Sequence, residues 1–304
     1  MAALRNDPGL DELATEGWDA EGADLDLRST EELVRLMAEA DAGVPAAVDG
    51  ARRALAAAID ATAARLAAGG RIVYVGAGTS GRLALVDAVE CQSTFGLEPG
   101  RVVALVAGGA SGTAVAQEHA EDDAESGAAE LRALAVTDAD AVVGISASGR
   151  TPYVLAALDE AQRVGALTVA VVCVGGSPLG TLADHEITVV VGAEVLSGST
   201  RLKAGTAQKL VLNTISTVSM IRVGKTFGNL MVDVVATNEK LRARVRRIVT
   251  LATGATPQEV DAALDAAGGD AKVAIVMLLA ATDAATARTR LEDAGGVVRK
   301  ALAP

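Results

Sequence analysis

The chain is poor in aromatic residues, which make up 2% of its 304 positions. Half of the residues are nevertheless hydrophobic and 22% are charged, which indicates a packed core and argues against global disorder. The core must therefore consist of Val, Leu, Ile and Ala, as in buried parallel strands and the helices that cover them. A chain of this length is expected to form one large α/β domain and a small appendage.

Histidine and cysteine are also scarce, with only His119, His185, Cys91 and Cys173 present. Two histidines cannot build a His-rich metal site, and neither cysteine has the spacing of a metal-binding motif. We therefore expect a protein that uses no metal ion and no cofactor. The two cysteines could form a disulfide, but buried free thiols in a reducing compartment are the favoured interpretation.

Positive charge is in deficit, since 27 Lys and Arg stand against 39 Asp and Glu, for a formal net charge of −12. Such a chain repels nucleic-acid backbones, and no basic stripe with interleaved aromatics is visible. The acidic N-terminus lacks the apolar core of a signal peptide, and the longest apolar stretches are strand-sized or interrupted by charge. We expect a cytoplasmic protein that binds neither nucleic acid nor membrane.

The first part of the chain predicts a tail followed by two helices. Residues 1–28 read as a tail, and Ser29 with Glu32 forms a capping box that opens a helix ending near Ala40. A second, Ala-rich helix is expected from about Pro45 to Ala68, where two glycines supply a left-handed stop.

From residue 72 onwards, short β-rich runs alternate with helical stretches. The runs cover residues 72–75, 102–106, 141–145, 168–172 and 187–191. Continuous apolar strands separated by helices indicate a parallel sheet covered on both faces. The sequence therefore predicts a flavodoxin-like doubly wound five-stranded parallel sheet, with the usual strand order 2-1-3-4-5. Helices are expected after the last strand, over about 203–223 and 238–250.

The character of the sequence changes again after Gly254. Thr256, Pro257 and Glu259 form a second capping box with proline at the first helical position, and Asp270 and Asp283 are plausible N-caps. This pattern predicts a small three-helix appendage. The expected domains are a tail over 1–28, a catalytic domain with flanking helices over 29–250, and a small helical, UBA-like appendage over 254–304.

Two loops at strand ends are candidates for holding phosphate. The first strand runs into Gly76-Ala77-Gly78-Thr79-Ser80-Gly81, formally the G-x-G-x-x-G pattern of dinucleotide sites. Those sites also need an acidic residue about 20 positions later, at the end of the second strand. That strand ends in Leu105-Val106-Ala107-Gly108-Gly109, without a carboxylate. The loop is therefore expected to bind a phosphate that does not belong to a dinucleotide.

The second loop follows the third strand and contains Ser146, Ser148, Gly149 and Thr151. Its hydroxyls and backbone N–H groups can surround an anion at a helix start, although each hydroxyl could instead merely cap that helix. In the expected strand order both loops lie at the point where the chain reverses direction, where ligands bind. The predicted substrate-binding residues are Gly78, Thr79, Ser80, Ser146, Ser148 and Thr151.

Two strings in these loops, GAGTSGRL and SASGRTPY, resemble the substrate loops of sugar isomerase (SIS) domains. The longer string VGAEVLSGSTRLKAGTAQKLVLNTIST, followed by KTFGNLMVDVVATNEKLR, resembles the N-acetylmuramic acid 6-phosphate etherases, from about Thr15 to the C-terminus. The glucokinase regulatory protein is a related family that binds phosphosugars without turning them over. The resemblance implies a lyase that cleaves a lactyl ether, giving N-acetylglucosamine 6-phosphate and D-lactate, in cell-wall amino sugar recycling.

The resemblance also implies the catalytic residues, with Glu90 as the acid at the lactyl oxygen and Glu121 as the base at sugar carbon 2. From the residues alone, both glutamates would normally be interpreted as solvated surface. Glu118 competes with Glu121 because it lies one helical turn away, and His119 is a weaker alternative base. Arg201, Lys203 and Lys209 could offset substrate charge, but a cationic helix beside a partner subunit is an equally good interpretation.

Two further functions share this fold, a non-catalytic phosphosugar sensor and an aldose–ketose isomerase. The presence of both glutamates favours the etherase over the sensor, and the long C-terminal strings argue against both alternatives. A homodimer is also expected, because SIS domains commonly complete their sites across subunits. The helix after the last strand supplies apolar residues for that interface: Leu210, Val211, Ile215, Val218 and Ile221.

Overall fold

The computed structural model describes residues 15–18, 22, 24–109, 118–236 and 238–303. Contacts divide the chain into two compact units. The first contains Met1–Ala88 and Gly100–Ser216, and the second contains Val89–Pro99 and Thr217–Pro304. Most of the predicted N-terminal tail lies outside the described residues.

The first unit is built on a parallel sheet of strands β1 (Ile72–Gly76), β2 (Val102–Val106), β3 (Ala141–Ile145), β4 (Leu167–Val172) and β5 (His185–Thr188). Their order is β2-β1-β3-β4-β5, which confirms the predicted topology. Every residue of the three central strands is buried, as expected for a sheet covered on both faces. The last strand begins and ends earlier than the predicted run of 187–191, and it starts with the polar residues His185 and Glu186, which an edge strand tolerates.

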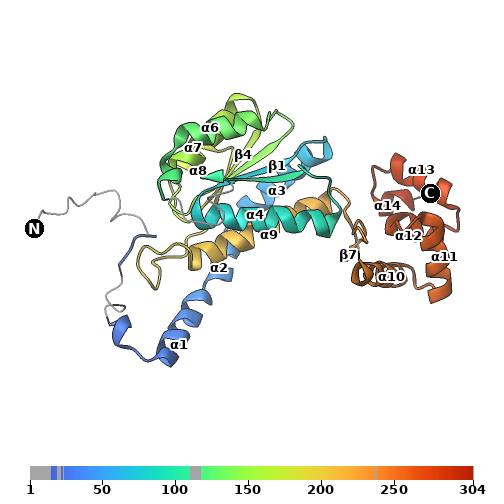
Figure 1. Ribbon diagram of the computed structural model, residues 1–304, viewed down its shortest axis with the longest axis horizontal. Helices are drawn as coiled ribbons and strands as arrows, with labels where there is room; N and C mark the ends of the chain where they lie inside the picture. Colours follow the sequence, from blue (N-terminus) through green and yellow to red (C-terminus); the bar gives the residue numbers. More distant parts are fainter. Residues whose placement is uncertain (1–14, 19–21, 23, 110–117, 237, 304) are drawn as a thin grey trace, which may run out of the picture. The chain divides into compact units, whose positions relative to one another are not determined.

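One face of the sheet is covered by α6 (Ala124–Ala133), α7 (Pro152–Arg163) and α8 (Pro178–Leu182) (Figure 1). Val73 and Val75 of β1 belong to the apolar core on this side. Their side chains share a face because alternate residues of a strand point the same way.

The opposite face carries α4 (Gly78–Phe95) and α9 (Lys203–Arg222). Tyr74, which alternates with the two valines, donates a hydrogen bond from its hydroxyl to Asp87 of α4 at 2.9 Å. Asn213 of α9 donates to the same carboxylate at 2.7 Å. This buried carboxylate therefore ties the sheet, α4 and α9 together.

The N-terminal helices are α1 (Thr30–Asp41), α2 (Val44–Gly50) and α3 (Arg52–Ala67), preceded by the short 3₁₀ helix η2 (Leu25–Leu27). The capping box at the start of α1 is confirmed. The prediction of one continuous second helix is wrong, because the chain leaves helical geometry at Ala51 (φ −86°, ψ 2°). Gly50 directly before this break has low helix propensity, which favours an interruption there.

The second unit holds a two-stranded hairpin and a group of helices. The hairpin pairs β6 (Thr226–Phe227) with β7 (Leu230–Met231). The helices are α10 (Glu239–Thr253), α11 (Pro257–Ala267), α12 (Ala271–Ala280), α13 (Ala284–Asp293) and α14 (Val298–Ala301).

Local sequence signals set the boundaries of these helices. The capping box of Thr256 and Glu259 is present, and Asp270 and Asp283 cap α12 and α13. The one-turn helix α14 adds to the three predicted helices. One apolar core runs from Val232 through α10 to α14. The predicted domain boundary between 250 and 254 falls inside this unit, and it stays a prediction.

Both cysteines are buried thiols, as expected. Burial, and then the Glu194 carboxylate, raises the pKa of the Cys173 thiol to about 12, so it is no nucleophile at neutral pH. Within the described ranges, no helix has the length and apolar character needed to cross a bilayer.

Candidate active site

The first candidate loop joins β1 to α4, and close packing demands glycine there. A Cβ on Gly81 would lie 2.6 Å from the backbone oxygen of Gly76. The helix therefore begins almost in contact with the strand end, with Gly78, Thr79 and Ser80 in its first turn. The free N–H groups of such a turn, with the helix dipole, favour an anion.

The second loop joins β3 to α7 and contains a cluster of three hydroxyls. Ser146 Oγ lies 2.8 Å from Thr151 Oγ1 and 3.4 Å from Ser148 Oγ. The structure thus brings these three predicted residues together. Thr151 occupies the N-cap position of α7, but its side chain makes no capping hydrogen bond. Helix capping therefore does not explain why Thr151 carries a hydroxyl.

The shape of this loop depends on Gly149, which adopts a left-handed conformation (φ +64°). A Cβ there would lie 2.4 Å from the Ser177 side chain, so no other residue fits without displacement. The Gly149 N–H donates to Ser146 Oγ at 3.0 Å. A tight turn held by glycine therefore presents the hydroxyl cluster.

The two loops leave adjacent strands of the sheet. β1 and β3 are paired in parallel, with Gly76 opposite Ile145 at their carboxyl ends. The sheet order also reverses between these two strands, since β2 lies beyond β1 and β4 beyond β3. Both loops therefore start at the position where doubly wound sheets bind ligands.

Helix α9 contributes a third group of residues to this region, which the sequence did not single out as a site. A Cβ on Gly205 would lie 3.4 Å from the methyl group of Thr79. One turn later, Gln208 accepts a hydrogen bond from Ser80 Oγ at 2.9 Å. The string AGTAQK contains both residues, but nothing in it indicates which loop they face.

The start of α9 is held by a buried glutamate. The Glu194 carboxylate accepts hydrogen bonds from the backbone N–H groups of Lys203 and Ala204, each at 3.0 Å. A carboxylate at this end of a helix satisfies free N–H groups and complements the helix dipole. Glu194 therefore fixes the position of α9 beside the first loop.

The two predicted catalytic glutamates occupy different surroundings. Glu90 is exposed on α4, one turn after the buried Asp87. Asp87 accepts from Tyr74, Asn213 and also Ser216, at 3.1 Å, so the helix that carries Glu90 is firmly anchored.

Glu121 is exposed on the 3₁₀ helix η3 (Glu118–Asp122), which precedes α6. Asp123 follows directly and caps α6 by accepting from Ser126 N at 3.0 Å. Glu90 and Glu121 fall in different compact units. Their pairing in one site stays a prediction, as does the choice of Glu121 over Glu118.

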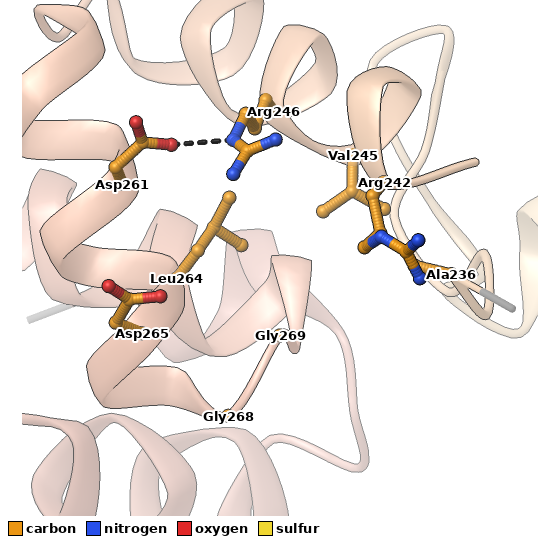
Figure 2. A pocket seen from close by; sticks show the side chains of 9 residues that line it. All are labelled: Ala236, Arg242, Val245, Arg246, Asp261, Leu264, Asp265, Gly268 and Gly269. Atoms are coloured by element: carbon orange, nitrogen blue, oxygen red, sulfur yellow. Dashed lines mark hydrogen bonds and ion pairs between the residues drawn. The ribbon is translucent and has the colours of Figure 1, made fainter. Parts of the chain in front are cut away.

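The second unit contains a pocket of its own, between α10 and α11 (Figure 2). Its cavity volume is about 220 Å³, with Val245 and Leu264 among the lining residues. Arg246 donates to Asp261 at 2.6 Å across it. Its lining contains no Ser, Thr, Cys, His or Lys side chain, and the Arg246 and Asp261 side chains bond to each other.

The chain is similar to a known family profile and to solved structures over parts of its length. Residues 54–162 match the family profile described as glucokinase regulatory protein N-terminal SIS domain. A phosphoheptose isomerase structure from Francisella tularensis aligns with 64% of this chain and all of its own, at 19% identity and a TM-score of 0.48.

Two curated relatives match nearly the whole chain. The N-acetylmuramic acid 6-phosphate etherase of Rubrobacter xylanophilus is 59% identical over 97% of this chain and 98% of its own. The protein of the same name from Streptomyces coelicolor is 54% identical over 97% of this chain and 94% of its own. Identity this high over the full length is decisive for membership. The chain belongs to the N-acetylmuramic acid 6-phosphate etherase family.

Proposed function

We propose that this protein is a carbon–oxygen lyase that cleaves the D-lactyl ether of N-acetylmuramic acid 6-phosphate. The products are N-acetylglucosamine 6-phosphate and D-lactate, in cell-wall amino sugar recycling. The observation that carries this function is the near full-length identity to proteins named for the activity. The same relatives favour an enzyme over a non-catalytic sensor or an aldose–ketose isomerase.

The chemistry follows from the position of the ether. An alkoxide is a poor leaving group, but the lactyl ether lies at carbon 3, beta to the latent aldehyde at carbon 1. Once the ring opens, the proton at carbon 2 becomes acidic and the alkoxide can leave by β-elimination. Water then adds across the double bond. The sequence of steps needs a base at carbon 2 and an acid at the leaving oxygen.

Two glutamates are proposed for these roles, Glu121 as the base and Glu90 as the acid. Similar carboxyl groups can serve opposite roles when their environments set different protonation states. The exposure of both side chains leaves them accessible to a ligand. The firm anchoring of α4 through Asp87 supports Glu90, because an acid must be held within hydrogen-bond reach of the leaving oxygen.

The phosphate is proposed to bind at the carboxyl edge of the sheet, between the loops after β1 and β3. The bonded hydroxyls of Ser146 and Thr151, and the start of α4, support this position. The proposed binding residues are Gly78, Thr79, Ser80, Ser146, Ser148 and Thr151.

The catalytic roles are tested by separating proton exchange from cleavage. Glu121→Ala should lose both deuterium exchange at carbon 2 and lactate release, by about 10²- to 10⁴-fold. Glu90→Ala should release little lactate yet still exchange the carbon-2 proton with deuterated solvent. Glu118→Gln is the matched control and should lose little of either.

Three outcomes would change this assignment. Exchange lost in Glu90→Ala but kept in Glu121→Ala would reverse the roles, and an essential Glu118 would displace Glu121. Oxygen from labelled water should appear at carbon 3 of the sugar. Label in the lactate hydroxyl would exclude elimination.

A homodimer is also proposed, but its predicted interface needs correction. Val211 and Ile215 of α9 are buried within the chain itself, whereas Ile221 is 46% exposed. Exposed apolar side chains also lie on α4, where Val86 and Val89 are 60% and 55% exposed. Light scattering should give twice the chain mass, and Val86→Asp should lower that mass if α4 forms the interface. A wild-type monomer at micromolar concentration contradicts the proposal.

The appendage over 254–304 is proposed to act in packing or assembly. Its helices share one apolar core with α10 and the preceding segment. A cytoplasmic location is proposed as well, because two buried free thiols suit a reducing compartment.

A further inference from the structure

Gln208 is a buried amide with a single polar contact in the described structure. Its side chain lies on α9 and the residue is 1% exposed. Oε1 accepts the hydrogen bond from Ser80 Oγ at 2.9 Å. Nε2 is buried and has no hydrogen-bond partner. The amide therefore serves one hydroxyl and no other polar group of this region.

Packing does not explain an amide at this position. A buried N–H donor without a partner destabilises the folded state, whereas an apolar side chain of similar length would fill the same space without that penalty. Buried polar groups that remain unsatisfied in a native structure are commonly found at functional sites. The contact to Ser80 is the feature that a methionine could not reproduce.

The position of Gln208 relative to Ser80 is fixed by the contacts of the two helices that carry them, α9 and α4. Gly205 lies one turn earlier on the same face of α9 and approaches Thr79 of the first loop. The Glu194 carboxylate holds the first turn of α9 through two backbone N–H groups. Ser80 in turn belongs to the first turn of α4. The amide and the hydroxyl are thus carried by two helices that pack closely where they meet.

A serine hydroxyl has one proton, so its partner decides what it offers to a ligand. While Ser80 donates to Oε1, it can only accept from a ligand. A half-turn of the amide places Nε2 against Ser80, which then accepts from Gln208 and can donate its own proton. Nε2 gives up no hydrogen bond in this turn, because it has none. A phosphate, which offers only acceptors at neutral pH, would select the second orientation.

We propose that Gln208 is a positioning residue that orients the Ser80 hydroxyl, so that Ser80 donates its proton to a ligand phosphate oxygen. This inference rests on the proposed function of the loop after β1 as a phosphate site. Without Gln208, the Ser80 hydroxyl loses the group that orients its proton toward the ligand. The loop would then lose a donor without losing its fold.

The test compares Gln208→Met, Ser80→Ala and the double variant by lactate release and by calorimetric binding of N-acetylglucosamine 6-phosphate. Gln208→Met should raise KM and Kd by about 3- to 10-fold, the weight of one hydrogen bond, with kcat within about twofold. In the Ser80→Ala background the same substitution should add nothing, because Gln208 acts through Ser80. The thermal midpoint should stay the same or rise.

Ser219→Ala is the matched control. Ser219 is a fully buried hydroxyl, about three turns further along α9, and no described residue bonds to it. It should also keep or raise the midpoint, but leave KM and Kd unchanged.

Additive effects of the two single substitutions on Kd overturn the proposal, as does an unchanged Kd in Gln208→Met. A fall of the midpoint by more than about 4 °C in Gln208→Met also overturns it, because the amide would then be structural. Failure of the wild type to release lactate, with sugar phosphate binding intact, overturns the etherase function alone. If the wild type also fails to bind the sugar phosphate, both the etherase function and the role of Gln208 are overturned.

Discussion

The two ends of the same sheet are built in opposite ways. At the amino end, Arg71 directly precedes β1 and Asp140 directly precedes β3. The Arg71 side chain donates to the Asp140 carboxylate at 2.8 Å and to the Leu134 carbonyl at 3.2 Å. The backbone N–H groups of Arg71 and Thr137 donate to the same carboxylate. At this end, the charged side chains of Arg71 and Asp140 therefore find their hydrogen-bond partners within the protein.

At the carboxyl end, the two candidate loops present uncharged hydroxyls, and Gln208 adds an amide. Ser146 and Thr151 bond to each other, while the nitrogen of the Gln208 amide has no partner among the described residues. Hydrogen bonds that are complete within the protein contribute to stability, and those left incomplete are available to a ligand. We infer from this contrast that the amino end stabilises the sheet, and the contrast supports the proposal that the carboxyl end binds the ligand.

The largest effect should come from breaking the amino end. Asp140→Ala removes the partner of a half-buried Arg71 and leaves the Thr137 N–H without its acceptor, so we expect a loss of about 3 kcal/mol in the free energy of unfolding. Urea unfolding measures this change. Asp138→Ala, which removes an exposed carboxylate two residues away, is the control and should change stability by less than about 0.5 kcal/mol.

The same ion pair predicts a pH dependence. Burial alone would raise the pKa of Asp140, but the hydrogen bonds from Arg71 and Thr137 together hold that pKa below its ordinary value. A lowered pKa in the folded state means that this stabilisation is present above about pH 3.9 and is lost as the pH falls through the folded pKa. The stability difference between wild type and Asp140→Ala should therefore shrink below pH 4. A difference that grows in acid contradicts this interpretation.

A smaller effect, seen in binding and not in stability, should follow from Ser148→Ala at the carboxyl end. Ser148 accepts from the Arg150 N–H at 3.3 Å and is only partly buried. We expect KM for the phosphosugar to rise about tenfold, the weight of a hydrogen bond to a charged group, while urea unfolding barely changes. Asp140→Ala, assayed under conditions in which it is still folded, should instead lose stability and keep the KM of the wild type. If Ser148→Ala lost stability without a change in KM, the carboxyl end would stabilise the sheet as the amino end does, and the contrast between them would be wrong.

The smallest effect is expected from Gly205→Ala. The added methyl group would contact Thr79 at an ordinary van der Waals distance of 3.4 Å. Replacing glycine inside a helix removes backbone freedom from the unfolded chain, so stability should rise by about 0.5–1 kcal/mol. Thermal unfolding measures this gain. A clear loss of thermal stability would contradict this prediction, because it would mean that α9 and α4 pack too closely at Gly205 to admit a methyl group.

The sequence predicted the elements of both units well where the signal is local. The capping boxes of Ser29 and Thr256 are confirmed because each joins residues three positions apart, whose hydrogen bonds form within one helical turn. The continuous helix expected across Gly50 was wrong, because the prediction gave too little weight to the low helix propensity of this glycine, and the chain leaves helical geometry at Ala51. The last strand was misplaced because the prediction followed apolar residues alone, whereas this edge strand begins with polar ones.

For the candidate site, the sequence by itself determined the two glycine- and hydroxyl-rich loops, and the preferred order of parallel strands placed them side by side. Only the tertiary structure decided what faces them. Ser80 and Gln208 are 128 residues apart, and Asp87 and Asn213 are 126 apart. Strand periodicity and helix caps depend on neighbouring residues, so a sequence displays them directly. A hydrogen bond between two helices depends on which faces pack together, and that is settled only when the sheet assembles and α9 lies against α4.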